Sequence, residues 1–184
     1  PGGLQIGGGI TGGNAHKWLN AGAAAVIVTS WVLYDGCVDE NRLSRLAADI
    51  GKARLGLDLS CRRRDQAYVV VTDRWRTFTR EEIRFSLLER LSRYCGEFLI
   101  HAVDVEGRCQ GIERPLVELL GRWGKIPVTY AGGIHTPEDI EAIRDLGRGH
   151  LDFTVGSALD IFGGQGLRYA DLALSYSASD CSSI

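Results

Sequence analysis

Two glycine-rich segments near opposite ends of the chain are near-copies of each other, and this repeat limits the folds that the chain can adopt. Residues 7–10 (GGGI) and 131–134 (AGGI) each close an apolar run and precede a helix-like stretch. About one strand–helix unit later, residues 28–30 (VTS) and 155–157 (VGS) end further β-branched runs. Paired glycines at a strand end let backbone N–H groups approach an anion. Each half of the chain therefore predicts a phosphate-binding turn, and the substrate is expected to carry a phosphate at each of two ends.

Short apolar runs alternate with amphipathic stretches, which is typical of parallel strands joined by helices. The expected strands are residues 4–7, 25–29, 54–59, 98–103, 128–131 and 152–155. The expected helices are residues 13–21, 40–50, 80–94, 114–123 and 137–146, with a short one starting near Ala158. Thr136 is expected to cap the helix at 137–146, and Gly147 to take a left-handed conformation just past its end. Residues 67–72 and 75–78 interrupt the alternation and predict a β-ribbon between the third strand and its helix.

Six strand–helix units allow either an open doubly wound sheet or most of an eight-stranded (β/α)8 TIM barrel. An open sheet usually has one phosphate turn, whereas turns on two separate strand pairs fit a barrel built by duplication. We therefore expect an α/β fold that is a partial TIM barrel, two units short of eight. Residues 1–184 are expected to form this single domain, with a disordered tail at 175–184.

The composition excludes several classes of function. A formal net charge of −2 gives no electrostatic case for a nucleic-acid or membrane partner. No apolar run is long enough to span a bilayer, and no signal-peptide pattern opens the chain. The five cysteines are scattered and form no C-x-x-C pair, which favours reduced thiols over a disulfide framework or a zinc site.

Acidic side chains follow two of the expected strands. Asp58 ends an apolar strand, and substrates bind at the carboxyl-terminal face of a barrel, so Asp58 is a catalytic candidate; a carboxylate that caps a backbone turn is the alternative. Asp104 and Glu106 follow the next strand and suit acid–base work better than metal binding, because no third ligand is evident. His101 could contact substrate, although a lone histidine at a strand end is often a hydrogen-bonded structural group.

Two further side chains near the expected ribbon are candidates for ligand contacts. Arg62 belongs to a run of three arginines, for which a solvated basic loop is the usual interpretation, yet one arginine could hold a phosphate bidentately. Trp75 could fold over a flat heteroaromatic ligand, and a plain packing role fits its position equally well.

Together these motifs resemble the phosphoribosylformimino-5-aminoimidazole carboxamide ribotide isomerase family of histidine biosynthesis. The resemblance is carried, in the family's order, by residues 7–10 (GGGI), 26–30 (VIVTS), 57–62 (LDLSCR), 71–75 (VTDRW), 101–107 (HAVDVEG), 129–133 (TYAGG) and 154–164 (TVGSALDIFGG). The last four segments are most like the eukaryotic-type branch. The resemblance implies an eight-stranded barrel with half-barrel symmetry, no metal or organic cofactor, and an Amadori rearrangement of a bisphosphorylated aminoaldose (ProFAR) to an aminoketose (PRFAR).

The resemblance also implies roles for individual residues. Asp58 matches the family's general acid and Trp75 its loop tryptophan that closes over substrate, with His101, Glu106 and Arg62 expected to bind substrate. The residues expected to bind phosphate are Gly8, Gly9, Thr29 and Ser30 in the first half and Gly132, Gly133, Gly156 and Ser157 in the second.

The chain departs from the family at its start, because Pro1 stands at the family's third strand. The resemblance places the partner base of Asp58 on the first strand, so this sequence holds no residue for it. A barrel without two strands exposes two edge strands, and we expect these 184 residues alone to be inactive and poorly stable. The complete protein is expected to be a cytoplasmic monomer, or plastidic if the parent is of plant type.

Two other functions are open to this sequence. The sister imidazole-glycerol-phosphate synthase cyclase shares the duplicated barrel and both phosphate sites, but the segments 72–75 and 101–107 favour the isomerase. A non-catalytic barrel that binds a phosphorylated metabolite would keep the glycine turns and gain nothing from Asp58.

Overall fold

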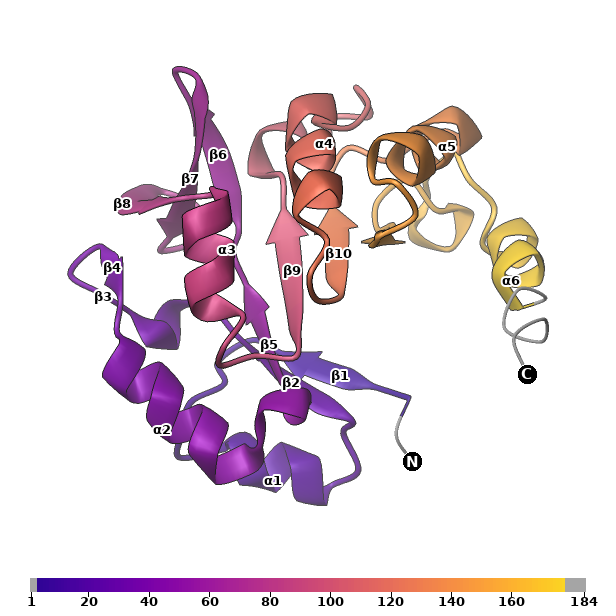
Figure 1. Cartoon of the computed structure of the whole chain (residues 1–184). Coiled ribbons are helices and arrows are strands. Elements are labelled where there is room, and N and C mark those ends of the chain that lie inside the picture. Colours follow the sequence, from indigo (N-terminus) through magenta and orange to yellow (C-terminus); the bar gives the residue numbers. More distant parts are fainter. Residues whose placement is uncertain (1–2, 178–184) are drawn as a thin grey trace.

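A parallel sheet of six strands, which curls as it crosses the molecule, forms the centre of the fold in a computed structural model that describes residues 3–177 (Figure 1). In spatial order the strands are β1 (Gln5–Gly7), β2 (Ala25–Val28), β5 (Leu55–Asp58), β9 (Glu97–His101), β10 (Val128–Ala131) and β11 (Leu151–Thr154). Every neighbouring pair is parallel. The spatial order follows the chain order, so the expected strands and the alternation of strands and helices are confirmed.

Helices lie between successive strands and cover one face of the sheet (Figure 1). They are α1 (Ala15–Asn20), α2 (Glu40–Ile50), α3 (Phe85–Leu91), α4 (Arg114–Trp123) and α5 (Pro137–Leu146), with α6 (Tyr169–Ser177) after β11. The short helix expected near Ala158 is a single 3₁₀ turn at Asp160–Phe162. Residues 175–177 belong to α6 and residues 178–184 lie outside the described part, so the disordered tail stays a prediction.

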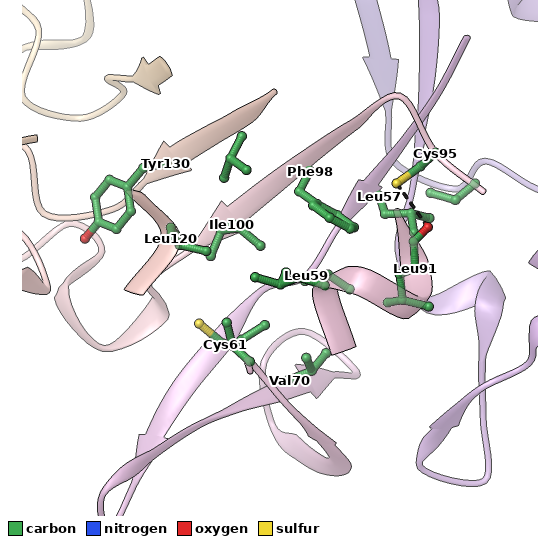
Figure 2. Packing of buried hydrophobic residues seen from close by; sticks show 14 of the residues in the cluster. Leu57, Leu59, Cys61, Val70, Leu91, Cys95, Phe98, Ile100, Leu120 and Tyr130 are labelled. Carbon is green, nitrogen blue, oxygen red and sulfur yellow. Dashed lines mark hydrogen bonds between the residues drawn. The ribbon is translucent and has the colours of Figure 1, made fainter. Parts of the chain in front are cut away.

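Alternation along the strands separates a buried face from an open one. Val26, Leu57 and Phe98 point toward the helices and are fully buried, whereas the adjacent positions Ile27 and Leu99 point to the opposite face and are half-buried. Figure 2 shows part of the buried layer, in which Leu57, Phe98 and Leu91 of α3 pack together. The core therefore lies between the sheet and its helices, as expected for βα units.

A three-stranded antiparallel ribbon is inserted between β5 and α3. It consists of β6 (Cys61–Arg64), β7 (Ala67–Thr72) and β8 (Thr77–Glu82), and it stands at the end of the sheet to which the arrowhead of β9 points (Figure 1). The expected helix at 80–94 is therefore wrong in its first part, because residues up to Glu82 pair with β7 and the helix begins only at Phe85. A small hairpin, β3 (Leu33–Tyr34) with β4 (Cys37–Val38), lies beside β8.

The ends of α5 show one prediction confirmed and one wrong. Thr136 Oγ1 accepts a hydrogen bond from the Asp139 N–H, and the Asp139 carboxylate accepts one from the Thr136 N–H, which together form a capping box. Gly147 is not left-handed, since its φ is −75°. The left-handed conformation falls instead on Arg148 and Gly149, at φ 56° and 69°.

The described cysteines Cys37, Cys61, Cys95 and Cys109 are all free thiols. Within residues 3–177 no helix is long and apolar enough to cross a membrane.

Candidate active site

A cavity of about 500 Å3 lies beneath the ribbon, at the carboxyl ends of β2 and β5. Side chains from the ends of β2 and β5 and from the ribbon tip line it, among them Thr29, Ser30, Asp58, Ser60, Arg74 and Trp75. Parallel strands bring their carboxyl ends to one edge, which is why residues far apart in sequence meet here. The structure therefore brings Asp58, Trp75 and two of the four residues of the first expected phosphate site, Thr29 and Ser30, into one cavity, whereas Gly8 and Gly9 do not line it.

The Asp58 carboxyl group is half-buried in the wall of this cavity. Burial raises its pKa above the usual value for an aspartate, and this effect exceeds the opposing influence of its partners. The partners are the Ser60 hydroxyl, which donates a hydrogen bond of 2.9 Å to Asp58 Oδ1, and the charge of His101. Asp58 is thus arranged to hold a proton at a higher pH than a solvated carboxyl group.

The tip of the ribbon has an unusual backbone. Asp73, Arg74 and Trp75 have φ values of 51°, 54° and 68°, so three successive residues with side chains are left-handed. Each such residue costs about 1–2 kcal/mol, which surrounding contacts must offset. Trp75 is 39% exposed, and its ring meets the His101 ring edge to face with centroids 5.0 Å apart.

His101 is also paired on its other side. Its Nε2 lies 2.9 Å from Glu106 Oε2, and both side chains are partly buried. Glu106 in turn lines a second, much smaller hollow of about 10 Å3, together with Gly133, Gly156 and Ser157. The second expected phosphate turn is therefore assembled at this hollow, and the His101–Glu106 pair lies between it and the Trp75 cavity.

The two glycine pairs differ in their surroundings. Gly132 and Gly133 have φ values of 112° and 77°, and a Cβ atom on Gly132 would lie 2.6 Å from the Ala102 carbonyl oxygen. A Cβ atom on Gly133 would collide with the carbonyl of Gly111, so this pair is needed for packing against the loop after β9. Gly8 and Gly9 are left-handed as well, at φ 88° and 68°, but open space surrounds them. Glycine is favoured at these two positions by the left-handed backbone alone, because no neighbouring atom would contact a Cβ atom there.

The arginine run that follows Asp58 is a strand of the ribbon rather than a solvated loop. Arg62 Nε donates to Asp104 Oδ1 at 2.8 Å, and the Arg63 N–H donates to Asp104 Oδ2 at 2.7 Å. The guanidinium groups of Arg62 and Arg64 both lie over the Phe78 ring. Asp104 and Glu106 thus have different partners, and no group of three or more His, Cys, Asp or Glu side chains in residues 3–177 is placed to hold a metal ion.

Comparison with known proteins shows the family of this chain. A family model described as "Histidine biosynthesis protein" matches residues 2–164. The chain belongs to this histidine biosynthesis family.

Relatives within the histidine biosynthesis family have one activity in their names. The chain is 50% identical over 172 residues to a chloroplastic phosphoribosyl imidazole-4-carboxamide isomerase of Medicago truncatula, covering 94% of this chain and 55% of that protein. It is 48% identical over 176 residues to the isomerase of Yarrowia lipolytica, covering 91% of this chain and 67% of that protein. The isomerase of Neurospora crassa is 47% identical, with 91% of this chain and 66% of that protein covered. The chain therefore spans between about half and two thirds of these relatives.

Sequence reasoning missed one polar group of the site in this family member. Ser60 was not singled out, although its hydroxyl is the hydrogen-bond donor to Asp58. A serine two residues after an acid at a strand end is the signal that could have identified it, because the short side chain can turn back toward the carboxylate. The substrate- and phosphate-binding roles expected for the other site residues stay predictions.

Proposed function

We propose that this chain forms part of an aldose–ketose isomerase that converts the bisphosphorylated aminoaldose ProFAR to the aminoketose PRFAR. The observation that carries the proposal is the cavity in which a half-buried carboxyl group, Asp58, and the expected phosphate turn at Thr29–Ser30 lie beneath the Trp75 indole. The names of the relatives support the same reaction. The substrate is a small molecule with two phosphates, one for each glycine-containing turn.

In this proposal Asp58 acts as the general acid. It donates its proton to the ribose ring oxygen, so that the ring opens and the C1′–N bond becomes an iminium group. A base then removes the C2′ proton, and the resulting enolamine tautomerises to the aminoketose. The raised pKa of Asp58 supports this role, because an acid must be protonated at the working pH. The base is a second carboxylate, which the family resemblance places on a strand outside this sequence.

The complete protein in this proposal is a (β/α)8 barrel. The curled six-stranded sheet supplies its third to eighth strands, and the half-buried face with Ile27 and Leu99 becomes the barrel interior. The proposed protein works without metal or organic cofactor. Its location is the cytoplasm, or the plastid if the parent is a plant protein, as the Medicago relative's name indicates for that protein.

Turnover in a chimaera tests the proposal. The chimaera is the Yarrowia lipolytica relative in which the segment that matches the present chain is replaced by this chain. The remaining residues of the relative are kept. We expect isomerase activity, and we expect Asp58→Asn to lower kcat by roughly 10²- to 10⁴-fold, the usual contribution of a general acid. Asp49→Asn is the matched control, because Asp49 is an exposed aspartate that pairs with His16 away from the cavity.

Other outcomes point elsewhere. Ammonia-dependent conversion of PRFAR by the chimaera would assign the sister cyclase reaction. Tight binding of the substrate without turnover, in a chimaera that unfolds as cooperatively as its parent, would assign a binding protein. Equal turnover in the chimaera with and without Asp58→Asn would show that a different group supplies the proton.

A further inference from the structure

The His101–Glu106 pair occupies a position that its expected role as a simple substrate contact does not explain. On one side, the His101 ring meets Trp75, a wall of the larger cavity. On the other, Nε2 is held by Glu106, a wall of the smaller hollow. The pair therefore links the ribbon tip to the loop after β9, across the boundary between the two halves of the site.

Trp75 is only partly covered by its surroundings. It belongs to the left-handed turn at 73–75, and about two fifths of its surface is exposed. The His101 ring is the aromatic contact of its indole, with an interplanar angle of 72°. Edge-to-face contacts of this kind are strong enough to favour one indole orientation severalfold.

The elements next to His101 carry several charged residues. They are Asp58 on β5, Arg62 on β6, Asp73 and Arg74 at the ribbon tip, and Asp104 and Glu106 after β9. Arg62 and Asp104 pair with each other, and Glu106 alone is in hydrogen-bonding contact with the imidazole among these groups. The carboxylate of Glu106 therefore sets the orientation of the ring that Trp75 meets.

We infer that His101 is a positioning residue, oriented by Glu106, that holds the Trp75 indole over the Asp58 cavity and joins the two phosphate-binding halves into one site. The effect of His101 on catalysis rests on the proposed function, whereas the contact between His101 and Trp75 does not. His101 acts through Trp75 in this assignment and transfers no proton to the substrate.

The fluorescence of Trp75 tests the contact without any need for activity. The signal of Trp75 is obtained by subtracting the spectrum of Trp75→Phe, which removes the contribution of Trp18, Trp31 and Trp123. In the parent chain the His101 ring lies against the indole and shields part of it from water. In His101→Asn this ring contact is lost, so the Trp75 emission should move to longer wavelength.

Two further variants keep the test decisive. Glu106→Ala removes the partner of His101 Nε2, so it should loosen the ring and move the Trp75 emission in the same direction even if His101→Asn proves difficult to fold. His16→Asn is the matched control, since His16 forms an exposed 3.0 Å pair with Asp49 elsewhere, and it should leave Trp75 emission unchanged. If Trp75 emission is the same in the parent, His101→Asn and Glu106→Ala, the assignment is overturned.

A double-mutant cycle in the active chimaera tests the consequence for catalysis. We expect His101→Asn and Trp75→Phe each to lower kcat/KM by roughly ten- to hundredfold, as a misplaced binding group does. If His101 acts through Trp75, the double variant should be no worse than Trp75→Phe alone. Fully additive losses would contradict the positioning role. A chimaera with no turnover would count against the proposed function only, because the fluorescence result would still decide the contact.

Discussion

At the scale of single residues, Asp58 combines a polar function with an unfavourable environment. Its carboxylate is held at a cavity wall by one hydroxyl donor, and burial raises its pKa despite that donor and the nearby His101 charge. A carboxyl group that is harder to ionise in the folded state than in the unfolded state lowers stability as the pH rises from its unfolded pKa through its folded pKa. The feature that suits Asp58 to act as an acid is therefore also a cost to the fold at neutral pH.

We predict that Asp58→Asn makes the protein more stable at neutral pH. Because the pKa of Asp58 is raised in the folded protein, the folded state is most stable when Asp58 is protonated. This contribution to stability is fully present below the unfolded pKa of about 4, and it is lost as the pH rises through the folded pKa. Asparagine has no charge to bury, so the gain in unfolding temperature over the parent should be largest near pH 7 and should disappear toward pH 3. Thermal unfolding of both proteins across this range measures it. A gain that is independent of pH would show that ionisation is not the cause.

The sequence placed Asp58 at a strand end and Trp75 in an inserted ribbon, because both kinds of element can be recognised from their patterns, and in the structure the two residues line one cavity. Their roles stay predictions. The sequence did not reveal what Arg62 contacts. The Asp104 carboxylate that pairs with Arg62 lies 42 positions away along the chain, and only the pairing of strands brings the two together. Long-range ion pairs of this kind leave no local signal in a sequence.

At the scale of elements, the contact between α4 and α5 depends on two glycines. Gly121 lies inside α4 and faces Gly147 just past the end of α5. A Cβ atom on Gly121 would lie 2.5 Å from the Gly147 Cα, and no flexible side chain can move to make room. The two helices can approach this closely only because both residues lack side chains.

We predict that Gly121→Ala is destabilising, in contrast to the usual effect in a helix. Alanine is about 1 kcal/mol more favourable than glycine in a helix interior. Here the forced separation of two backbones should outweigh that gain, for a net loss of roughly 1–3 kcal/mol. Urea unfolding measures the change, and Gly3→Ala is the control because nothing lies within 4 Å of a Cβ atom there. A more stable Gly121→Ala variant would contradict the close packing of α4 on α5.

The elements themselves were largely predictable, with one instructive failure. Residues 80–94 contain many strong helix formers, and local preference predicts one long helix. The structure assigns the first of these residues to β8, where the Glu81 carboxylate accepts hydrogen bonds from the Val38 N–H and from Arg90 of α3. Pairing with β7 and these side-chain contacts override the local preference. Such contacts form only after the chain has folded, so the sequence pattern could not indicate them.

At the scale of the whole molecule, the described sheet has two open edges. Among residues 3–177, β1 and β11 each pair with a neighbour on one side only. The sheet face opposite the helices keeps Ile27 and Leu99 half-buried. Unpaired strand edges and exposed apolar groups both favour association and lower the stability of a chain on its own.

We predict that the 184-residue chain unfolds at lower urea concentration than the chimaera with the Yarrowia lipolytica relative, and over a broader range. The reason is that the additional residues of the relative can pair with the edges and cover the open face. Circular dichroism and tryptophan fluorescence should give transitions that do not coincide for the chain alone. A sharp, reversible transition of the isolated chain, at the same urea concentration as the chimaera, would contradict this prediction.

The order of strands in the sheet has a consequence for synthesis. Each strand pairs with the one that precedes it in the sheet and in the chain, so a new strand always finds its neighbour already made. A chain that emerges from the ribosome from its amino end can therefore extend the sheet one strand at a time. The Trp75 cavity can assemble when β9 has been added, whereas the hollow with Gly156 requires β11. The two halves of the candidate site thus form at different times during translation, and the hollow with Gly156 is the later of the two.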